Sequence, residues 1–339
     1  LADRLGYTGA MDLIVPAAFF VLSAIAALIG TGGALRYLRS RVLDIPNDRS
    51  SHAVPTPKGA GLAVIPVVLV AWAAANYGLS GPFMPWLLGS ALALGLVSWI
   101  DDRRDLSQLV RLAAQVLVVG ILLYFWPDER LVLQGLAPFW LDRLFTGLAW
   151  IWFINLFNFM DGIDGISGVE TIALGLGASL VFGFGGGAPI FGLFGAAIAG
   201  AALGFLWWNW QPAKVFLGDV GSVPLGLLLG WLLLELAVAG QWAAAIILPL
   251  YYLADSGLTL ARRALRGENF FRAHREHYYQ KAVLNGQSHA AVSALIGATN
   301  VGLISMALVS MINPAAGIVG AAFMTFIALL ALKRAPKKP

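Results

Sequence analysis

The chain has no cysteine among its 339 residues, and only 12% of them are charged, whereas 59% are hydrophobic. The absence of cysteine excludes a disulfide framework and leaves the redox compartment undetermined. The scarcity of charge, with a mean hydropathy of +0.79, excludes an ordinary soluble domain, whose apolar content is about 45–50%. The composition therefore indicates an integral membrane protein.

Long polar segments are also missing, so no stretch of soluble-type composition is long enough to fold by itself. We expect a single integral-membrane domain over residues 11–339. Residues 1–10 are polar and precede Met11, which opens the first apolar run. We expect this decapeptide to be an added segment or a processed end, and it does not enter the prediction of the fold.

Apolar segments recur along the whole chain, each near the ~20 residues that cross a hydrocarbon core. Lipid offers the backbone no hydrogen-bond partners, so such spans are helical. The sequence therefore predicts an all-α, polytopic transmembrane bundle of about eleven helices. Their expected ranges are 13–36, 60–78, 83–100, 107–126, 139–157, 169–185, 189–209, 222–240, 242–261, 289–312 and 314–332.

The basic residues lie almost entirely in alternate loops. Every Lys and Arg of the chain falls on one side of the predicted bundle except Arg4, Arg130 and Arg143. Cytoplasmic loops carry the excess of Lys and Arg. We therefore expect the N-terminus outside, the C-terminus in the cytoplasm, and the acidic loops at the cytoplasmic face.

Aspartates gather in three of these cytoplasmic loops. Asp101, Asp102 and Asp105 follow the third span. The alternative to a functional role is a structural one, in which these carboxylates are solvated or complement the positive N-terminal end of the next helix. Asp161 and Asp164 are each followed by Gly in NFMDGIDGIS, where glycine permits a tight turn or a close ligand. A third position, in VFLGDVGS at residues 215–222, adds Asp219.

Several neighbouring residues have a structural interpretation as well as a functional one. Ser167 and Glu170 have the spacing of a capping box, which predicts that Glu170 is structural. Asn155 and Asn158 lie where the fifth span ends, and they either hold the loop or contact a polar ligand. Phe216 is equally an interface aromatic or a platform for a nucleobase.

Two histidines, His274 and His277, lie three residues apart in RAHREHYYQ. A two-histidine zinc site would need carboxylate help, so we favour phosphate binding or proton handling. His289 begins a span, and we expect it at the membrane interface. Asp255 and Glu235 lie within spans and are functional candidates by position; we expect Glu235 to pair with another helix.

Converging carboxylates need a cation. At ~4 Å and an effective dielectric constant of about 20, each like-charge pair costs about 4 kcal/mol. An all-oxygen ligand set without cysteine suits Mg²⁺ or Mn²⁺. Mg²⁺ commonly bridges to substrate phosphates, and the surrounding bases can bind the remaining phosphate oxygens. The pattern predicts metal-assisted phosphoryl chemistry between a water-soluble donor and a lipid-borne acceptor.

Five ordered motifs, SSHAVPTPKGAGLA, DDRRDLS, NLFNFMDGIDGISG, VFLGDVGS and AHREHYYQ, resemble those of the polyprenyl-phosphate N-acetylhexosamine-1-phosphate transferases, the MraY/WecA superfamily. The resemblance covers about residues 44–290. It implies transfer of a sugar 1-phosphate from a UDP-N-acetylhexosamine to undecaprenyl phosphate at the bacterial inner membrane, with release of UMP. It implies no nucleic-acid partner, and a homodimer is compatible with it.

The resemblance also implies roles for particular residues, each matched to a motif. Asp101, Asp102, His274 and His277 are expected to be catalytic, with Asp101 or Asp102 deprotonating the lipid phosphate. Asp219, together with Asp102, is the expected magnesium site, with Mn²⁺ as an alternative. The expected nucleotide and substrate contacts are Lys58, Asn155, Asn158, Asp161, Asp164, Phe216 and Arg275.

Two positions depart from the enzymes that make the first peptidoglycan lipid, which carry Lys at the position of Asp105 and consecutive histidines where this chain reads His277, Tyr278, Tyr279. The departures favour the branch that initiates O-antigen or other surface polysaccharides. A secondary transporter of an anionic solute and a non-catalytic lipid-binding scaffold remain the alternatives. The identity of the hexosamine, direct or covalent transfer, and the oligomeric state stay open.

Overall fold

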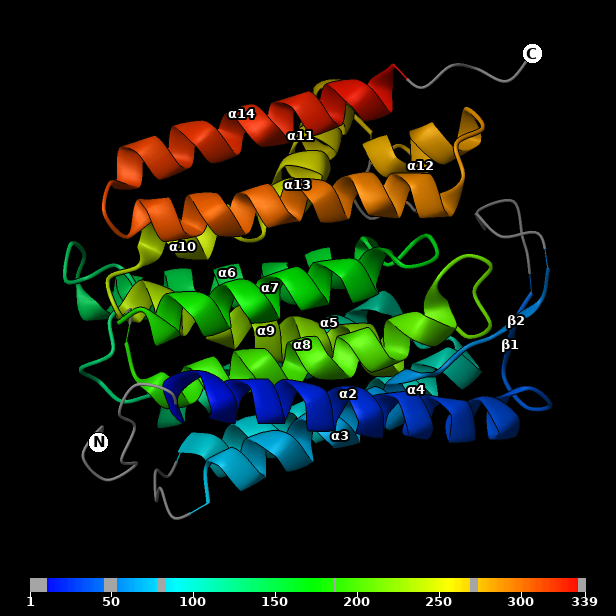
Figure 1. Ribbon diagram of the computed structural model, residues 1–339, viewed down its shortest axis with the longest axis horizontal. Helices are drawn as coiled ribbons and strands as arrows, with labels where there is room; N and C mark the ends of the chain where they lie inside the picture. Colours follow the sequence, from blue (N-terminus) through cyan, green and yellow to red (C-terminus); the bar gives the residue numbers. More distant parts are fainter. Residues whose placement is uncertain (1–10, 46–53, 78–82, 186, 269–273, 335–339) are drawn as a thin grey trace.

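The protein is described by a computed structural model that covers residues 11–45, 54–77, 83–185, 187–268 and 274–334 (Figure 1). The expectation for residues 1–10 lies outside this part of the chain. The all-α membrane bundle is confirmed, and among the described residues eight helices are long and apolar enough to cross a membrane. The helices are α2 (Met11–Leu38), α3 (Gly61–Ala75), α4 (Phe83–Arg104), α5 (Gln108–Phe125), α6 (Phe139–Phe159), α7 (Ile166–Gly183), α8 (Pro189–Asn209), α9 (Asp219–Val238), α10 (Trp242–Ile247), α11 (Leu250–Leu265), α12 (Tyr278–Leu284), α13 (His289–Ser310) and α14 (Pro314–Lys333).

One predicted span was wrong as a single helix. The stretch 242–261 is divided into α10 and α11, which meet at Leu248 and Pro249. Proline has no backbone N–H and its ring clashes with the preceding turn, so a helix that reaches Pro249 is interrupted there. The other ten predicted stretches each contain one helix.

The loop between α2 and α3 also contains two short strands. Strand β1 (Leu43–Asp44) pairs antiparallel with β2 (Thr56–Pro57). Residue Lys58, next along the chain, forms a parallel bridge with Phe216, far away in sequence. These backbone pairings attach the loop after α2 to the segment that leads into α9.

Helix α9 is the centre of the bundle. In its most apolar window 94% of the residues are buried, against 11% for α2 at the edge. Around α9 pack α4, α6, α7 and α3. Trp231 of α9 joins an aromatic cluster with Trp72 and Phe194, whose rings lie 5.5 and 5.9 Å from it. A buried α9 gives its first residue, Asp219, a fixed position at one end of the molecule.

The two ends of the bundle differ in the helix ends, strands and loops that they contain. At one end, shown on the right of Figure 1, α4 ends, α9 begins and the strands β1 and β2 lie; we call it the pocket end. At the far end, the loop 126–138 is held by Arg143, which donates to the carbonyls of Trp126, Pro127 and Arg130. Glu235 pairs with Arg130 of this loop rather than with another helix, which corrects the expectation for Glu235.

The course of the chain agrees with an odd number of crossings. Helix α2 starts at the far end, and α14 finishes at the pocket end (Figure 1). Which of the two ends faces the cytoplasm stays a prediction from the distribution of Lys and Arg.

Candidate functional site

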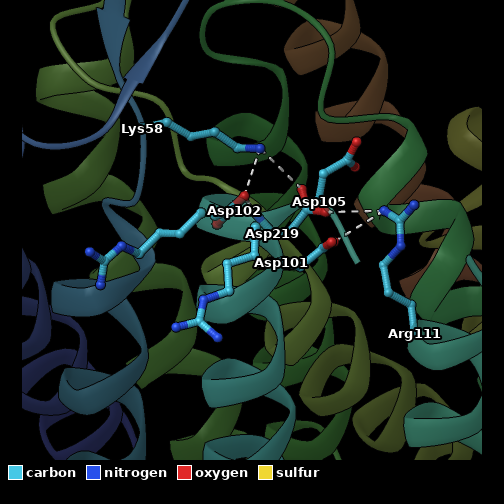
Figure 2. Close-up of a pocket in the computed structure, with 8 residues that line it drawn as sticks. Lys58, Asp101, Asp102, Asp105, Arg111 and Asp219 are labelled. Carbon is cyan, nitrogen blue, oxygen red and sulfur yellow. Dashed lines mark hydrogen bonds and ion pairs between the residues drawn. The ribbon is translucent and has the colours of Figure 1, made fainter. Parts of the chain in front are cut away.

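A charged cavity of about 500 Å³ opens at the pocket end (Figure 2). It lies where the last turn of α4, the first turn of α9, the start of α5 and the segment after β2 come together. Four acidic and four basic residues line it: Lys58, Asp101, Asp102, Arg103, Arg104, Asp105, Arg111 and Asp219. Three of the sequence-predicted acids and the predicted lysine therefore share one cavity.

The backbone around Lys58 carries its side chain to the cavity. The N–H of Lys58 donates to the carbonyl of Val42, and the N–H of Gly59 donates to the carbonyl of Phe216, at 3.0 Å in each case. Immediately afterwards α3 crosses α9 so closely that a Cβ on Gly61 would collide with the backbone of Gly221. The two glycines let the segment that bears Lys58 approach the first turn of α9.

Asp102 is fully buried and holds the start of α9. Its carboxylate accepts hydrogen bonds from the N–H groups of Asp219, at 3.2 Å, and Val220, at 3.0 Å. The residue before this turn, Gly218, has a φ of +75° and no side chain to cap the helix. Asp102 thus replaces the missing cap from another helix. Its Oδ1 also lies 2.6 Å from the Lys58 ammonium.

The neighbouring Asp101 has other partners. One of its oxygens accepts from the N–H of Leu106 at 2.7 Å, and the other lies 3.2 Å from the Arg111 guanidinium. Asp219 makes longer ion-pair contacts. One of its oxygens is 3.7 Å from Lys58 and the other is 3.7 Å from Arg111, and its side chain is 22% exposed. Among these carboxylates, Asp219 has the longest ion-pair contacts and is the most accessible (Figure 2).

Burial and neighbouring charges of both signs shift the pKa values of residues at the pocket end. Burial by itself lowers the pKa of Lys58, but the charges of Asp219 and Asp102 outweigh it, and the pKa is raised above its ordinary value. Lys58 is therefore a permanent cation at neutral pH. Burial raises the pKa of Asp161 to about 6; the hydrogen bond from Ser167 opposes the rise, and the charge of Asp219 adds to it.

The carboxylates do not form a complete metal cage. Within the described ranges, no group of three or more His, Cys, Asp or Glu side chains is arranged to hold a metal ion. Both oxygens of Asp102 already accept from the backbone, whereas no described backbone N–H donates to Asp219, whose carboxyl group contacts that of Asp101. The oxygen set fits a cation that takes one or two protein ligands and completes its shell with phosphate and water, as Mg²⁺ does.

Comparison with known families matches residues 84–237 to glycosyl transferase family 4. The chain resembles this family over that region. It is 28% identical over 331 residues to the decaprenyl-phosphate N-acetylglucosaminephosphotransferase of Mycobacterium tuberculosis strain H37Rv, over 86% of this chain and 82% of that protein. It is 25% identical over 285 residues to a probable undecaprenyl-phosphate N-acetylglucosaminyl 1-phosphate transferase of Bacillus subtilis, over 80% and 78% of the two chains.

A third relative is the phospho-N-acetylmuramoyl-pentapeptide-transferase of Kosmotoga olearia, 27% identical over 263 residues, which cover 72% of this chain and 79% of that protein. The family match includes Asp101, Asp102, Asp161, Asp164 and Asp219 but ends before the two histidines and begins after Lys58. Lys58 is linked to the family region through its contacts with Asp102 and Asp219.

The loop after α6 lies beside the cavity. Asp161 accepts from the hydroxyl of Ser167 at 2.7 Å, and Asn158 donates to the hydroxyl of Ser222 in the first turn of α9 at 2.8 Å. Asn155 instead donates to Gln115 of α5 at 2.6 Å, inside the bundle. These three residues are not among those that line the cavity, and their predicted nucleotide contacts stay predictions.

The predicted capping box at the start of α7 was wrong. The N-cap is Gly165, which makes no side-chain cap, and Ser167 donates to Asp161 instead. Glu170 is fully buried and accepts from the amide of Asn300 on α13 at 2.7 Å. Glu170 is structural as expected, but it links two helices rather than capping one.

Asp164 belongs to a second group away from the cavity lining. Its carboxylate accepts from the N–H of Ala213 at 3.0 Å and lies 3.1 Å from His289, and its carbonyl accepts from Ser293 at 2.8 Å. His289 is therefore buried against an aspartate, which corrects the expectation that it is only interfacial. This group joins the loop before α7 to α13.

His277 and Asp255 form a third group. Asp255 accepts from the backbone N–H groups of Tyr278, at 2.9 Å, and Tyr279, at 3.3 Å, and lies 3.2 Å from the His277 ring. Asp255 thus caps α12 from α11, as Asp102 caps α9 from α4. His277 is buried, and its predicted catalytic role stays a prediction.

His274 packs against His277, with ring centroids 5.0 Å apart. Burial, together with the nearby charges of His277 and Arg263, lowers the pKa of His274 to about 4. The imidazole is neutral at pH 7, so it offers a phosphate a hydrogen bond but no charge. Neither His274 nor Arg275 lines the cavity, and their substrate roles stay predictions.

Sequence reasoning missed three cavity arginines, Arg103, Arg104 and Arg111, as individual site residues. They counted only as part of the positive charge of the cytoplasmic loops. The available signal was their position within or just after DDRRD, next to two catalytic candidates. Phe216 is half-buried and pairs with Lys58 through the backbone, so it lies near the cavity without lining it.

Proposed function

We propose that the protein is a magnesium-dependent phosphotransferase. It transfers an N-acetylhexosamine 1-phosphate from a UDP-N-acetylhexosamine to undecaprenyl phosphate and releases UMP. The observation that carries the proposal is the partly exposed Asp219 between Lys58 and Arg111, at 3.7 Å from each, in a charged cavity at one end of a membrane bundle. Relatives whose names describe phosphotransfer to a polyprenyl phosphate support it.

In the proposed reaction a phosphate oxygen of the lipid attacks the sugar-bearing phosphorus of the donor. A new P–O bond forms, the bond from that phosphorus to the bridging oxygen breaks, and UMP leaves with the bridging oxygen. Lys58 and Arg111 hold positive charge where negative charge gathers on the phosphates. The cavity end of a membrane bundle lets a lipid acceptor and a water-soluble donor reach the same site.

The proposed roles of the two adjacent aspartates differ. Asp101 is the better candidate for the base that takes a proton from the lipid phosphate, because its carboxyl group contacts the cavity side chains Arg111 and Asp219 rather than the backbone of α9. Asp102 has no exposed side-chain surface, and both its oxygens accept from the backbone of α9. A metal ion at Asp102 would share oxygens that already contact the backbone of α9 and, at Oδ1, Lys58.

Asp219 is the residue that we propose to hold Mg²⁺, or Mn²⁺ in its place. Its carboxylate is the most accessible of the three, and substrate phosphates and water would complete the shell. An ion held by Asp219 would supply positive charge to offset the negative charge on the leaving UMP. Asp161 and Phe216 are the proposed contacts to the nucleotide side of the donor.

The test is UMP release by purified protein given a UDP-N-acetylhexosamine, undecaprenyl phosphate and Mg²⁺. Asp219→Asn is expected to lower turnover by about a hundredfold, since one electrostatic contact to a transition state contributes on that order. The matched control is Asp105→Asn, the same change on an exposed cavity aspartate. Normal turnover by the Asp219 variant, or turnover that is unchanged by chelation of divalent ions, would contradict the metal assignment.

The finer substrate and cellular context are also proposals. The departures at Asp105 and at Tyr278 and Tyr279 favour an enzyme that initiates O-antigen or another envelope polysaccharide at the cytoplasmic face of the inner membrane. A panel of UDP-N-acetylhexosamines with one lipid acceptor identifies the sugar. Use of UDP-N-acetylmuramyl pentapeptide in preference to the simple sugars would contradict this branch.

A further inference from the structure

Two cavity arginines have no acidic partner. Of the four bases that line the cavity, Lys58 and Arg111 each contact a buried aspartate of α4, at 2.6 and 3.2 Å. Arg103 and Arg104 are exposed, and neither forms an ion pair with any residue in the described part of the chain. Asp105 lies in the same cavity without pairing with them. The cavity therefore has two guanidinium groups available for an anion.

These arginines stand where the outer face of α4 meets the cavity. Leu92, Leu96 and Ile100 are 51%, 57% and 45% exposed along α4. At about 100° per residue, Arg103 continues the same helix face, and Arg104 lies one turn after Ile100. In a membrane bundle an exposed apolar face of this kind contacts lipid. The stripe thus leads from the hydrocarbon region directly to the two arginines.

Arg103 is also held in place. Its guanidinium lies 5.6 Å from the ring centroid of Trp99, one turn earlier on α4, a distance at which a cation is attracted to the aromatic face. Trp99 and Arg103 thus lie at the end of the apolar stripe. Aromatic rings and basic side chains are enriched at the depth of the lipid headgroups, so this arrangement is expected at the membrane surface.

A phosphomonoester on a lipid fits this place better than the diphosphate of a nucleotide. It carries a charge of about −1.5 to −2 at neutral pH, which two guanidinium groups match with paired N–H donors. Its chain confines it to the membrane, so it reaches the cavity sideways along the apolar stripe. A nucleotide comes from water, and its proposed contacts, Asp161 and Phe216, are on other elements.

We propose that Arg103 and Arg104 form the subsite for the phosphate of the polyprenyl acceptor, with the first part of its chain on the Leu92, Leu96 and Ile100 face of α4. The proposal deepens the function proposed above and rests on it for the identity of the acceptor. In this assignment both arginines bind the lipid phosphate and position its oxygen for attack.

The kinetic test compares Arg103→Gln, Arg104→Gln and the double variant in phosphatidylcholine nanodiscs. Each single change is expected to raise the KM for undecaprenyl phosphate about tenfold, the effect of losing a hydrogen bond to a charged group. The KM for the UDP-sugar should stay within about twofold. Arg104→Lys should recover part of the affinity, because lysine keeps the charge but not the paired donors.

Arg41→Gln is the matched control. Arg41 is an exposed arginine after α2 at the pocket end, and its guanidinium lies 4.6 Å from the Tyr37 ring, but it does not line the cavity. It should leave both KM values unchanged. Equal increases in the KM of donor and acceptor, or an unchanged KM for the acceptor in the double variant, would overturn the proposal.

Direct binding separates this proposal from the function itself. Binding of a short-chain polyprenyl phosphate is measured by thermal shift without any UDP-sugar, so it is visible whether or not the protein turns over. Loss of binding in the double variant supports the subsite, and absence of UMP release by the wild type counts against the proposed reaction alone. A second series adds phosphatidylglycerol to the nanodiscs. If the variants differ from wild type only in that series, the arginines bind a bilayer headgroup and the proposal fails.

Discussion

At the scale of single residues, most buried aspartates of this protein hold backbone N–H groups. Asp102 caps α9, Asp255 caps α12, Asp164 accepts from Ala213, and Asp142 accepts from Leu133 at 2.6 Å. A donor without an acceptor is costly where water is excluded, so a carboxylate from a neighbouring element takes that place. An aspartate in this sequence is therefore as much a structural acceptor as a catalytic candidate.

The cap on α9 predicts a stability difference between two aspartates of one cavity. Asp102→Asn puts an amide NH₂ among the N–H groups of α9 and weakens the contact with Lys58, so we expect the free energy of unfolding to fall by about 1–3 kcal/mol. Asp105→Asn, on an exposed residue with a φ of +53° that asparagine tolerates, should change it by less than about 0.5 kcal/mol. Denaturant unfolding in detergent measures both, and equal effects would refute the cap.

The raised pKa of Asp161 predicts a pH dependence of stability. Its folded-state pKa of about 6 exceeds the ordinary value of 3.8, so the folded state binds this proton more tightly than the unfolded state. The stabilising contribution is fully present below about pH 4 and is lost as the pH rises through about 6. The Tm difference between Asp161→Asn and wild type, followed from pH 4 to 8, should therefore shift in favour of the variant. A difference that does not vary with pH would contradict this.

At the scale of the elements, close helix crossings decide the geometry of the site. Gly61 of α3 touches the backbone of Gly221 in α9, and a Cβ on Gly218 would lie 2.9 Å from the Asp102 carboxylate. The side chains of the site come from several elements, and the glycines let these elements approach. The site is thus a product of helix packing more than of any one loop.

This crossing predicts a large effect from a single methyl group. Gly61→Ala should lower the free energy of unfolding by about 1–3 kcal/mol, because the added carbon has no room against Gly221. It should also weaken UMP release by moving Lys58 away from Asp102. The control is Gly89→Ala in α4, where nothing lies within 4 Å of the added carbon; its stability should stay within about 0.5 kcal/mol of wild type. Similar stabilities for the two variants would disprove the tight crossing.

At the scale of the whole molecule, the two ends differ in a way that bears on transport. At the far end the loop 126–138 is held by Arg143 and by the pair of Arg130 with Glu235, while the charged cavity lies at the other end. A transporter places its binding groups near the middle of the membrane, often on repeated halves. The acids of the cavity lie instead at helix ends, which favours surface chemistry over transport.

The predicted orientation can be tested with introduced cysteines, since the chain has none of its own. Leu136 in the far-end loop and Leu265 at the end of α11 are 91% and 89% exposed, which makes them a matched pair. In intact cells a membrane-impermeant maleimide should label Leu136→Cys but should label Leu265→Cys only after permeabilisation, because basic loops stay in the cytoplasm. The reverse pattern would invert the topology.

The sequence by itself determined the class of fold and predicted where acidic residues gather. Apolar runs of spanning length leave helices as the only way to satisfy the backbone in lipid, and aspartates beside glycines at the ends of those runs indicate a charged pocket. The family match over residues 84–237 contains three of the five motifs, DDRRDLS, NLFNFMDGIDGISG and VFLGDVGS.

Only the tertiary structure decided which neighbours each aspartate contacts. Asp101 and Asp102 are adjacent in sequence, yet one faces Arg111 and the other caps α9, because successive side chains of a helix point about 100° apart. The break at Pro249, the pairing of Asp164 with His289 and the two unpaired arginines likewise depend on contacts between elements far apart in the chain. Local patterns cannot specify such contacts, since the partner of a buried polar group is set by packing.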